Sequence, residues 1–276
     1  MSAADAALQA QRLEALRAQL AQHRAQAFCL PRADEYLGEY IPEHNERLRW
    51  LTGFSGSAGM AVVLAESAAI FVDGRYTVQV RRQVSAEHYQ YRHLLEEPPL
   101  AWLAQQLPAG GRVLVDPRCC TLDWFRRAQA QLREAGLELL ASTDNPVDRC
   151  WAQRPAPRIA PALLLAERFS GESSAAKRRR IGAEIAAAGA DAALVFAPES
   201  VSWLLNVRGR DVPRQPVLLS FAMLESDGRM QLAVDPARVP AGFAEHVGDG
   251  VSLVDERDGE RLLRRYAGRR VLADPA

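Results

Sequence analysis

Gly111-Arg-Val-Leu-Val-Asp-Pro117 returns near the end of the chain as Arg269-Arg-Val-Leu-Ala-Asp-Pro275, and this pair of strand-and-turn segments decides the fold. Ahead of each copy, a tryptophan-centred run precedes a predicted β-hairpin, with Trp50 in RLRWLTGF and Trp203 in SVSWLLNV. The spacing from tryptophan to final aspartate is similar in the two copies. We therefore expect two similar α/β domains in tandem.

The hydrophobic pattern predicts strands that alternate with helices at βα spacing, which is typical of mixed sheets flanked by helices. In the first copy, the pattern predicts helices over 5–24, 76–84, 100–107 and 121–135, and strands over 27–30, 60–65, 69–72, 89–95, 112–115 and 137–140. In the second copy, it predicts helices over 173–188, 237–246 and 259–266, and strands over 192–196, 217–224, 229–234 and 270–273.

A segment with four prolines separates the two copies and predicts an extended linker. We therefore divide the chain into a first α/β domain over 1–148, a linker over 149–172 and a second domain over 173–276. In the first copy a helix and a strand follow Pro117, whereas only one residue follows Pro275. We expect the second domain to be incomplete at its C-terminus, without an edge strand and a covering helix.

Composition excludes several classes of protein. The 276 residues include 34 Lys and Arg balanced by 34 Asp and Glu, so there is no net charge to attract nucleic acid or an acidic membrane. No window approaches the roughly 18 apolar residues of a membrane span, and the N-terminus lacks a signal-peptide pattern. The four cysteines form no CxxC pair and no disulfide framework. We expect a cytoplasmic protein without nucleic-acid or membrane partners.

Known catalytic motifs are missing from the sequence. There is no HExxH, no zinc-finger spacing of Cys and His, and no G-x-S-x-G elbow. Gly53-Phe-Ser-Gly-Ser-Ala-Gly59 leads into a predicted strand and is typical of a tight turn. Lys177-Arg-Arg-Arg180 is typical of a solvated helix face. We predict no catalytic residue and no metal ligand in this chain.

Phe71-Val-Asp-Gly-Arg-Tyr76 has the clearest functional potential. Asp73 is placed to cap the following helix by accepting a hydrogen bond from the backbone N–H of residue 75 or 76, which is a structural role. Arg75 then projects at the C-terminal end of a strand, where open α/β sheets place ligand contacts. Its guanidinium suits a carboxylate or a peptide carbonyl. The pattern leaves open whether Arg75 binds a ligand or only covers the surface.

Six runs in order along the chain resemble the Xaa-Pro aminopeptidases (aminopeptidase P) in their long, three-domain cytosolic form. The runs are Glu39-Tyr-Ile-Pro-Glu43, Leu51-Thr-Gly-Phe-Ser-Gly-Ser-Ala-Gly59, Val72-Asp-Gly-Arg-Tyr76, Asp144-Asn-Pro-Val-Asp148, Trp151-Ala-Gln-Arg-Pro155 and Ser202-Trp-Leu-Leu-Asn-Val-Arg-Gly-Arg-Asp-Val-Pro213. The resemblance implies two creatinase-type N-terminal domains. In the family these precede a pita-bread catalytic domain, which has no counterpart here. Ala33-Asp-Glu-Tyr-Leu-Gly38 departs from the family, which commonly has a histidine after the aspartate.

The resemblance implies an enzyme that releases an N-terminal residue preceding proline. In the family, five ligands on the catalytic domain hold two metal ions, commonly manganese, and none of these ligands has a counterpart here. We therefore expect this chain to be inactive alone, to shape substrate access and oligomerisation, and to form a homodimer. The implied partner is a peptide with proline at its second position. Arg75 would contact that peptide, while Asp73 and Tyr76 shape the turn.

Two alternatives stay open. One is a stand-alone dimerisation or interaction module without catalysis. The other is a related pita-bread enzyme such as creatinase or prolidase, but these have one N-terminal domain, and the linker with a second copy argues against them. An in-frame continuation past Ala276 that carries five metal ligands would favour the aminopeptidase, and a stop codon would favour the module.

Overall fold

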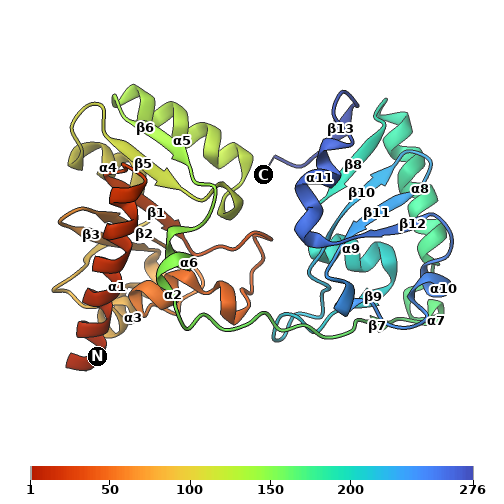
Figure 1. The fold of residues 1–276 in the computed structure, drawn as a ribbon, viewed down its shortest axis with the longest axis horizontal. Helices are drawn as coiled ribbons and strands as arrows, with labels where there is room; N and C mark the ends of the chain where they lie inside the picture. Colours follow the sequence, from red (N-terminus) through yellow and green to blue (C-terminus); the bar gives the residue numbers. More distant parts are fainter. Residues whose placement is uncertain (1, 276) are drawn as a thin grey trace. The chain divides into compact units, whose positions relative to one another are not determined.

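The computed structural model describes residues 2–275, which divide into two compact units over residues 2–156 and 157–275. Each unit has its own central sheet (Figure 1). Each also has its own apolar cores. The boundary between the units falls inside the proline-rich segment. The predicted fold class, two α/β domains in tandem, is confirmed.

The first unit is built on a sheet of six strands within residues 2–156. In spatial order they are β4 (Gln90–His93), β3 (Ala68–Val72), β2 (Gly59–Leu64), β1 (Ala27–Pro31), β5 (Arg112–Val115) and β6 (Glu138–Ala141). β1, β2 and β3 pair as antiparallel neighbours, whereas β4, β5 and β6 join the sheet in parallel. The sheet is therefore mixed.

Helices cover both faces of this sheet. They are α1 (Ala3–Gln22), α2 (Arg47–Thr52), α3 (Thr77–Gln83), α4 (Pro99–Gln106), α5 (Leu122–Glu134) and α6 (Pro146–Cys150). Leu13, Leu16 and Leu20 of α1 pack on one face, as their helical spacing predicts. Leu103 of α4 and Leu132 of α5 pack on the other face. Because β2 and β3 are covered on both sides, their sequences are almost continuously apolar.

The second unit repeats this topology with five strands in its main sheet within residues 157–275. In spatial order they are β12 (Val251–Val254), β11 (Met230–Ala233), β10 (Phe221–Glu225), β8 (Ala192–Val195) and β13 (Val271–Leu272). They have the same parallel and antiparallel neighbours as β4, β3, β2, β1 and β5. No strand equivalent to β6 pairs with β13 in residues 157–275.

The helices of the second unit are α7 (Glu167–Ser170), α8 (Ser174–Ala187), α9 (Pro198–Leu205), α10 (Phe243–Val247) and α11 (Gly259–Arg264). α8, α9 and α10 contribute to one core, and Leu262 of α11 contributes to the other. A small separate sheet joins β7 (Leu163–Leu164) to β9 (Val207–Arg208). β7 and α7 lie within the predicted linker, so the segment without regular structure is shorter than expected and covers residues 151–162.

Two sequence-based assignments in the second unit are wrong in detail, and two of its elements were not predicted. The strand predicted over 217–224 begins only at Phe221, because side chains hold the backbone before it. Leu218 N–H donates to Ser202 Oγ at 2.9 Å, and Leu219 N–H donates to Asp211 Oδ2 at 3.0 Å. The helix predicted over 237–246 is broken by Gly242, whose φ of 77° is left-handed. The elements α9 and β12 were not predicted at all.

The prediction of a solvated basic face holds for Arg179 and Arg180, which are exposed, but it is wrong for Lys177 and Arg178, which are only 2% exposed. Lys177 Nζ donates to Trp203 O and Asn206 Oδ1, and it lies 4.2 Å from the centroid of the Trp203 ring. Arg178 donates to three backbone carbonyls of neighbouring turns. Carbonyl oxygens therefore satisfy the charges that the sequence pattern assigned to solvent.

Candidate functional site

The segment Asp73–Tyr76 follows β3 at the C-terminal end of that strand. Asp73 Oδ1 accepts a hydrogen bond from the backbone N–H of Arg75 at 2.9 Å, which caps the 3-10 turn over Gly74–Tyr76. The predicted capping role of Asp73 is confirmed. The turn leads into α3 and places Arg75 on the surface at the end of the strand.

The side chains of Arg75 and Asp73 form a fork. Nε of Arg75 donates to both carboxylate oxygens, at 3.2 and 3.1 Å, and Nη2 donates to Oδ2 at 2.6 Å. Nη1 has no hydrogen-bond acceptor among residues 2–275, and the Arg75 side chain is 66% exposed. The end of the guanidinium that points away from Asp73 is therefore free to donate hydrogen bonds to a ligand.

Tyr76 supports this fork from the side. Its ring centroid lies 5.2 Å from Cζ of Arg75, which is a cation–π distance. Its hydroxyl lies 2.7 Å from Ser57 Oγ, and its ring meets Phe54 edge-on at 5.6 Å. A Cβ on Gly56 would lie only 2.3 Å from Phe54 Cζ, so glycine is required for this packing. The glycine-containing run before β2 therefore helps to fix the ring beside Arg75.

Both acidic and basic groups surround Arg75, and two of them are carboxylates. The side-chain hydrogen bonds from Arg75 lower the pKa of Asp73, and the same bonds raise the pKa of Arg75. Glu39 also raises the pKa of Arg75 by its negative charge, and His93, like Arg75, lowers the pKa of Asp73. At neutral pH, two carboxylates thus act on one guanidinium at this exposed site.

A second charged cluster, which was not predicted from the sequence, is buried around Arg47 of α2. Arg47 Nε and Nη2 donate to the two oxygens of Asp148 at 2.8 and 3.0 Å, and Nη1 lies 3.3 Å from Glu35 Oε2. Arg154 Nη1 lies 2.8 Å from Asp148 Oδ2, and Arg154 Nη2 donates to Asn45 Oδ1 at 2.7 Å. Asp148 and Arg154 lie in two of the runs that carry the family resemblance, which is the sequence signal that could have pointed to this cluster.

Burial and ion pairing compete in this buried cluster. Burial alone would lower the pKa of Arg47, but the hydrogen bonds and charges of Asp148 and Glu35 outweigh it and raise that pKa. Asp34, which accepts from Asn45 and from the backbone of Tyr36, has a raised pKa because burial and the charge of Glu35 disfavour its anion. The cluster links the loop before α2 to α6, so its role is to hold the first unit together.

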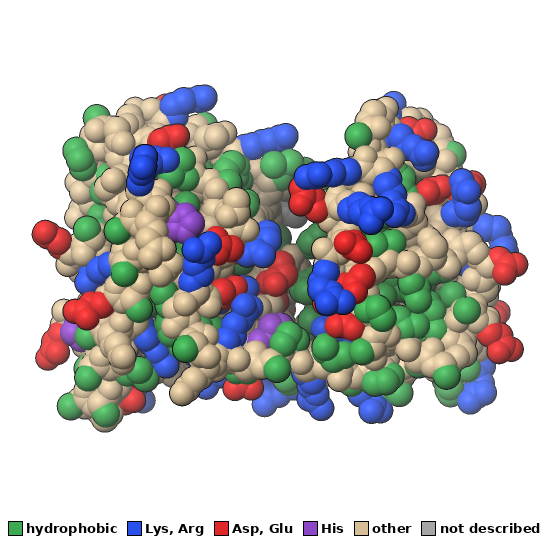
Figure 2. Space-filling view, viewed as in Figure 1, with side chains coloured by type: hydrophobic (Ala, Val, Ile, Leu, Met, Phe, Trp, Pro, Cys, Tyr) green, Lys and Arg blue, Asp and Glu red, His purple; other side chains and the backbone are tan. Residues whose placement is uncertain are grey.

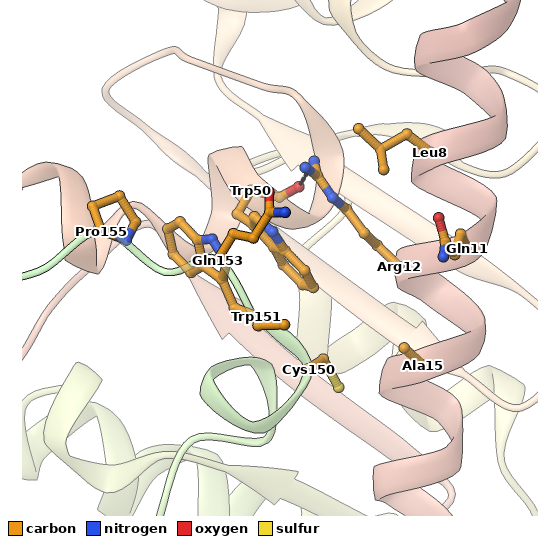
Figure 3. A pocket seen from close by; sticks show the side chains of 10 residues that line it. Leu8, Gln11, Arg12, Ala15, Trp50, Cys150, Trp151, Gln153 and Pro155 are labelled. Carbon is orange, nitrogen blue, oxygen red and sulfur yellow. Dashed lines mark hydrogen bonds between the residues drawn. The ribbon is translucent and has the colours of Figure 1, made fainter.

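A groove of about 490 Å³ lies between α1 and the start of the proline-rich segment (Figure 3). Trp50 and Trp151 stack with ring centroids 5.5 Å apart. Figure 3 shows Arg12 reaching from α1 towards Trp50, whose carbonyl oxygen accepts a hydrogen bond from Nη1. Gln153 and Pro155 complete the wall. Trp151 therefore packs on the first unit, although the sequence pattern predicted a linker there.

The charged side chains on the face shown in Figure 2 and the candidate metal ligands of residues 2–275 do not gather into a further site. In Figure 2, basic and acidic side chains are interspersed over the visible face of each unit. Among residues 2–275, no three His, Cys, Asp or Glu side chains come together in a way that could hold a metal ion. No helix within residues 2–275 is long and apolar enough to cross a membrane.

Comparisons with known proteins agree with this two-unit architecture. A family model described as the creatinase/prolidase N-terminal domain matches residues 12–150, and a second model with the same description matches residues 153–276. The solved X-prolyl aminopeptidase of Caenorhabditis elegans, described as a cytosolic enzyme with a di-nuclear active site, has a TM-score of 0.89 at 24% identity. That match covers 94% of this chain and 44% of the other chain, and it supports the fold.

Two curated relatives are similar in sequence. Xaa-Pro aminopeptidase 2 of Homo sapiens is 33% identical over 229 residues, and aminopeptidase P1 of Arabidopsis thaliana is 32% identical over 278 residues. These matches cover 82% and 96% of this chain, but only 34% and 43% of the relatives. The chain thus spans less than half the length of the relatives that it matches. It belongs to the creatinase/prolidase N-terminal domain family, with two such domains in tandem, as in the N-terminal regions of Xaa-Pro aminopeptidases.

Proposed function

We propose that this chain forms the two N-terminal domains of a metal-dependent Xaa-Pro aminopeptidase, and that Arg75 contacts the peptide substrate. The enzyme releases the N-terminal residue that precedes proline, and the residues of this chain shape access to the site where that bond is cut. The observation that carries the proposal is the exposed, forked Arg75 at the end of β3. The similarity to Xaa-Pro aminopeptidases over 82% of the chain supports it.

Arg75 suits a contact of this kind because it is already oriented. Asp73 holds one edge of the guanidinium and Tyr76 lies beside it, so little side-chain entropy is lost when a peptide oxygen accepts from Nη1. A hydrogen bond to a charged donor is stronger than a neutral one. Arg75 would therefore fix the position of the peptide, while the paired metal ions, predicted as manganese, lie outside residues 2–275.

The remaining parts of the proposal are a homodimer and a cytoplasmic location. The solved relative from Caenorhabditis elegans is described as a cytosolic enzyme, and this description supports the location. Light scattering of the purified protein measures its mass and tests the dimer.

The test uses the protein expressed from its complete gene, with Mn²⁺ and tripeptides that carry proline at the second position. Replacing Arg75 by Ala is expected to lower kcat/KM by about 10- to 100-fold, the value of a hydrogen bond to a charged group. Arg257→Ala is the matched control, because Arg257 forms the same fork with Asp255 in the second unit. This control is expected to keep the wild-type kcat/KM.

Two results would contradict the proposal. Equal kcat/KM for Arg75→Ala and the wild type would show that Arg75 does not contact the substrate. If the complete gene product fails to cleave before proline with Mn²⁺ or another divalent metal, the protein is not part of an Xaa-Pro aminopeptidase. Residues 1–276 alone are expected to cleave no Xaa-Pro bond, and metal-dependent cleavage by that purified chain would show that the catalytic group lies within it.

A further inference from the structure

We propose that the groove beside α1 binds a proline-rich peptide that carries an acidic residue, through the stacked rings of Trp50 and Trp151 and the guanidinium of Arg12. The inference does not rest on the proposed function, because it does not involve Arg75. It gives the first unit a binding site of its own, whose ligand is an extended peptide with apolar rings and a carboxylate.

The first argument is the apolar surface of the groove. The half-buried rings of Trp50 and Trp151 stack at 5.5 Å, with an angle of 22° between their planes. Figure 3 shows Leu8 of α1 on one side of these rings and Pro155 on the other, and Leu8 is 42% exposed. Aromatic grooves of this kind suit proline-rich peptides, which are extended before they bind and lose little conformational entropy.

The second argument concerns the polar groups of the groove. The indole N–H groups of Trp50 and Trp151 are not buried, and neither has an acceptor among residues 2–275. Gln11 and Gln153 add exposed side-chain amides. Within residues 2–275, no Asp or Glu lines the groove. A proline-rich peptide offers carbonyl oxygens and has few backbone N–H donors of its own, so its acceptors match the donors of the groove.

The third argument is the charge of Arg12. Its Nη1 donates to the carbonyl oxygen of Trp50, and its Cζ lies 4.8 Å from the centroid of the Trp50 ring. Burial lowers the pKa of Arg12, and no carboxylate within residues 2–275 acts on its charge. A half-buried cation without an anionic partner loses hydration that nothing replaces. A carboxylate on the peptide would supply that partner.

The second unit contains a cation and an indole in a closed arrangement. Trp203 corresponds to Trp50 in the sequence repeat, and Lys177 Nζ lies 4.2 Å from the centroid of its ring. Lys177 is 2% exposed and donates to Trp203 O and Asn206 Oδ1, so its charge is satisfied inside the unit. Arg12 also donates to the carbonyl of its tryptophan, but it lines an open groove. The contrast favours a ligand at Arg12.

The test titrates peptides at millimolar concentration into residues 1–276 and follows the five indole N–H signals by NMR. The probe is an N-acetylated run of prolines that ends in glutamate amide. The signals of Trp50 and Trp151 are expected to shift. Those of Trp102 and Trp124, which pack on the other face of the sheet, and that of Trp203 should not move.

Two control peptides separate the contributions of the prolines and of the charge. A peptide with glycine in place of every proline is expected to cause no shift at Trp50 or Trp151. A peptide that ends in glutamine amide keeps the prolines and loses the carboxylate. It is expected to bind about tenfold more weakly, the low end for a hydrogen bond between charged groups.

Arg12→Gln is the decisive variant, because it removes the charge and should make the glutamate and glutamine peptides bind equally. Arg17→Gln is the matched control. Arg17 lies on the same helix and donates to the Leu64 carbonyl at 2.9 Å, but it does not line the groove. This control should keep the tenfold preference. Gln11→Glu changes an exposed position without touching the tryptophan stack, and it should weaken the glutamate peptide about threefold by repulsion.

Several results would overturn the proposal. One is that the probe leaves the Trp50 and Trp151 signals unmoved, and another is that the glycine peptide binds as well as the probe. An unchanged preference in Arg12→Gln would refute the role of its charge. Shifts of these signals that follow protein concentration without any peptide would identify a second copy of this chain as the occupant. Loss of binding in the product of the complete gene, followed by tryptophan fluorescence, would show that another part of the protein covers the groove.

Discussion

Arg75 and Arg47 make nearly the same ion pair in two different settings. Each uses Nε and Nη2 to grip both oxygens of an aspartate, Asp73 for Arg75 and Asp148 for Arg47. The Arg75 side chain is 66% exposed, whereas that of Arg47 is 2% exposed. The partner of Arg75 is two residues away in sequence, and the partner of Arg47 is 101 residues away.

The difference in exposure suits the two arginines to different roles, ligand binding for Arg75 and stability for Arg47. An exposed pair within one turn gains little free energy and leaves its cation accessible to solvent. A buried pair between α2 and α6 leaves no room for a ligand, and the loss of one partner would strand the other charge away from water. We therefore expect the two arginines to respond in opposite ways when stability and binding are measured.

The largest effect is expected for Arg47→Met, which keeps the length of the side chain and removes its charge. Glu35 would lose its buried partner and Asp148 would keep only Arg154, so the free energy of unfolding should fall by about 3 kcal/mol, the low end of the range for a broken buried pair. Urea denaturation of residues 1–276, followed by tryptophan fluorescence, measures this. Four of the five tryptophans lie in the first unit, so the signal reports mainly on that unit.

A double variant sharpens this prediction. Arg47→Met combined with Asp148→Asn is expected to cost less than the sum of the two single changes, because the carboxylate that lost its bond from Arg47 is then neutral. Additive losses would show that the two residues do not act as a pair. A loss for Arg47→Met below about 1 kcal/mol would contradict the buried-charge argument.

A smaller effect on the free energy of unfolding is expected when pH is varied. The sign of this effect should differ between two buried aspartates of the first unit. Burial, together with the charge of Glu35, raises the pKa of Asp34. Burial would also raise the pKa of Asp116, but hydrogen bonds and charge from Arg118 outweigh it and lower that pKa. The folded state thus holds the proton of Asp34 more tightly, and that of Asp116 less tightly, than the unfolded state.

The signs follow from proton linkage. For Asp34, stability should fall as pH rises from the unfolded pKa of about 3.9 through the raised folded pKa. For Asp116, the stability present above pH of about 3.9 should be lost as pH falls through the lowered folded pKa. Free energies of unfolding of the wild type, Asp34→Asn and Asp116→Asn at pH 3, 4, 5.5 and 7 measure both signs. Differences from the wild type that do not change with pH would refute both signs.

Local patterns explain why much of the first unit was predictable from sequence. The strand over 112–115 and the helix of the first 24 residues follow from apolar spacing that the fold simply buries. The Asp73 cap depends on residues two positions apart, so a short sequence window contains it. The position of Arg75 at the end of β3 follows from the same window.

The missed features depend on partners that are distant in sequence. The burial of Arg47 requires Asp148, and the burial of Arg178 requires carbonyls of Gly228, Val247 and Asp249. A run of basic residues alone predicts a solvated face, because nothing local supplies those acceptors. The start of β10 was misplaced for the same reason, since Ser202 and Asp211 take the backbone donors before it.

The smallest effect is expected for Arg75→Met, the counterpart of Arg47→Met. Because the pair with Asp73 is exposed and screened, its loss should leave the free energy of unfolding unchanged within the precision of the titration. Asp73 still accepts from the backbone N–H of residue 75, so the cap survives the change. The same urea titration measures the difference between the two arginines directly. A loss comparable to that of Arg47→Met would mean that Arg75 stabilises the turn, and its exposure would then no longer indicate that it is available to a ligand.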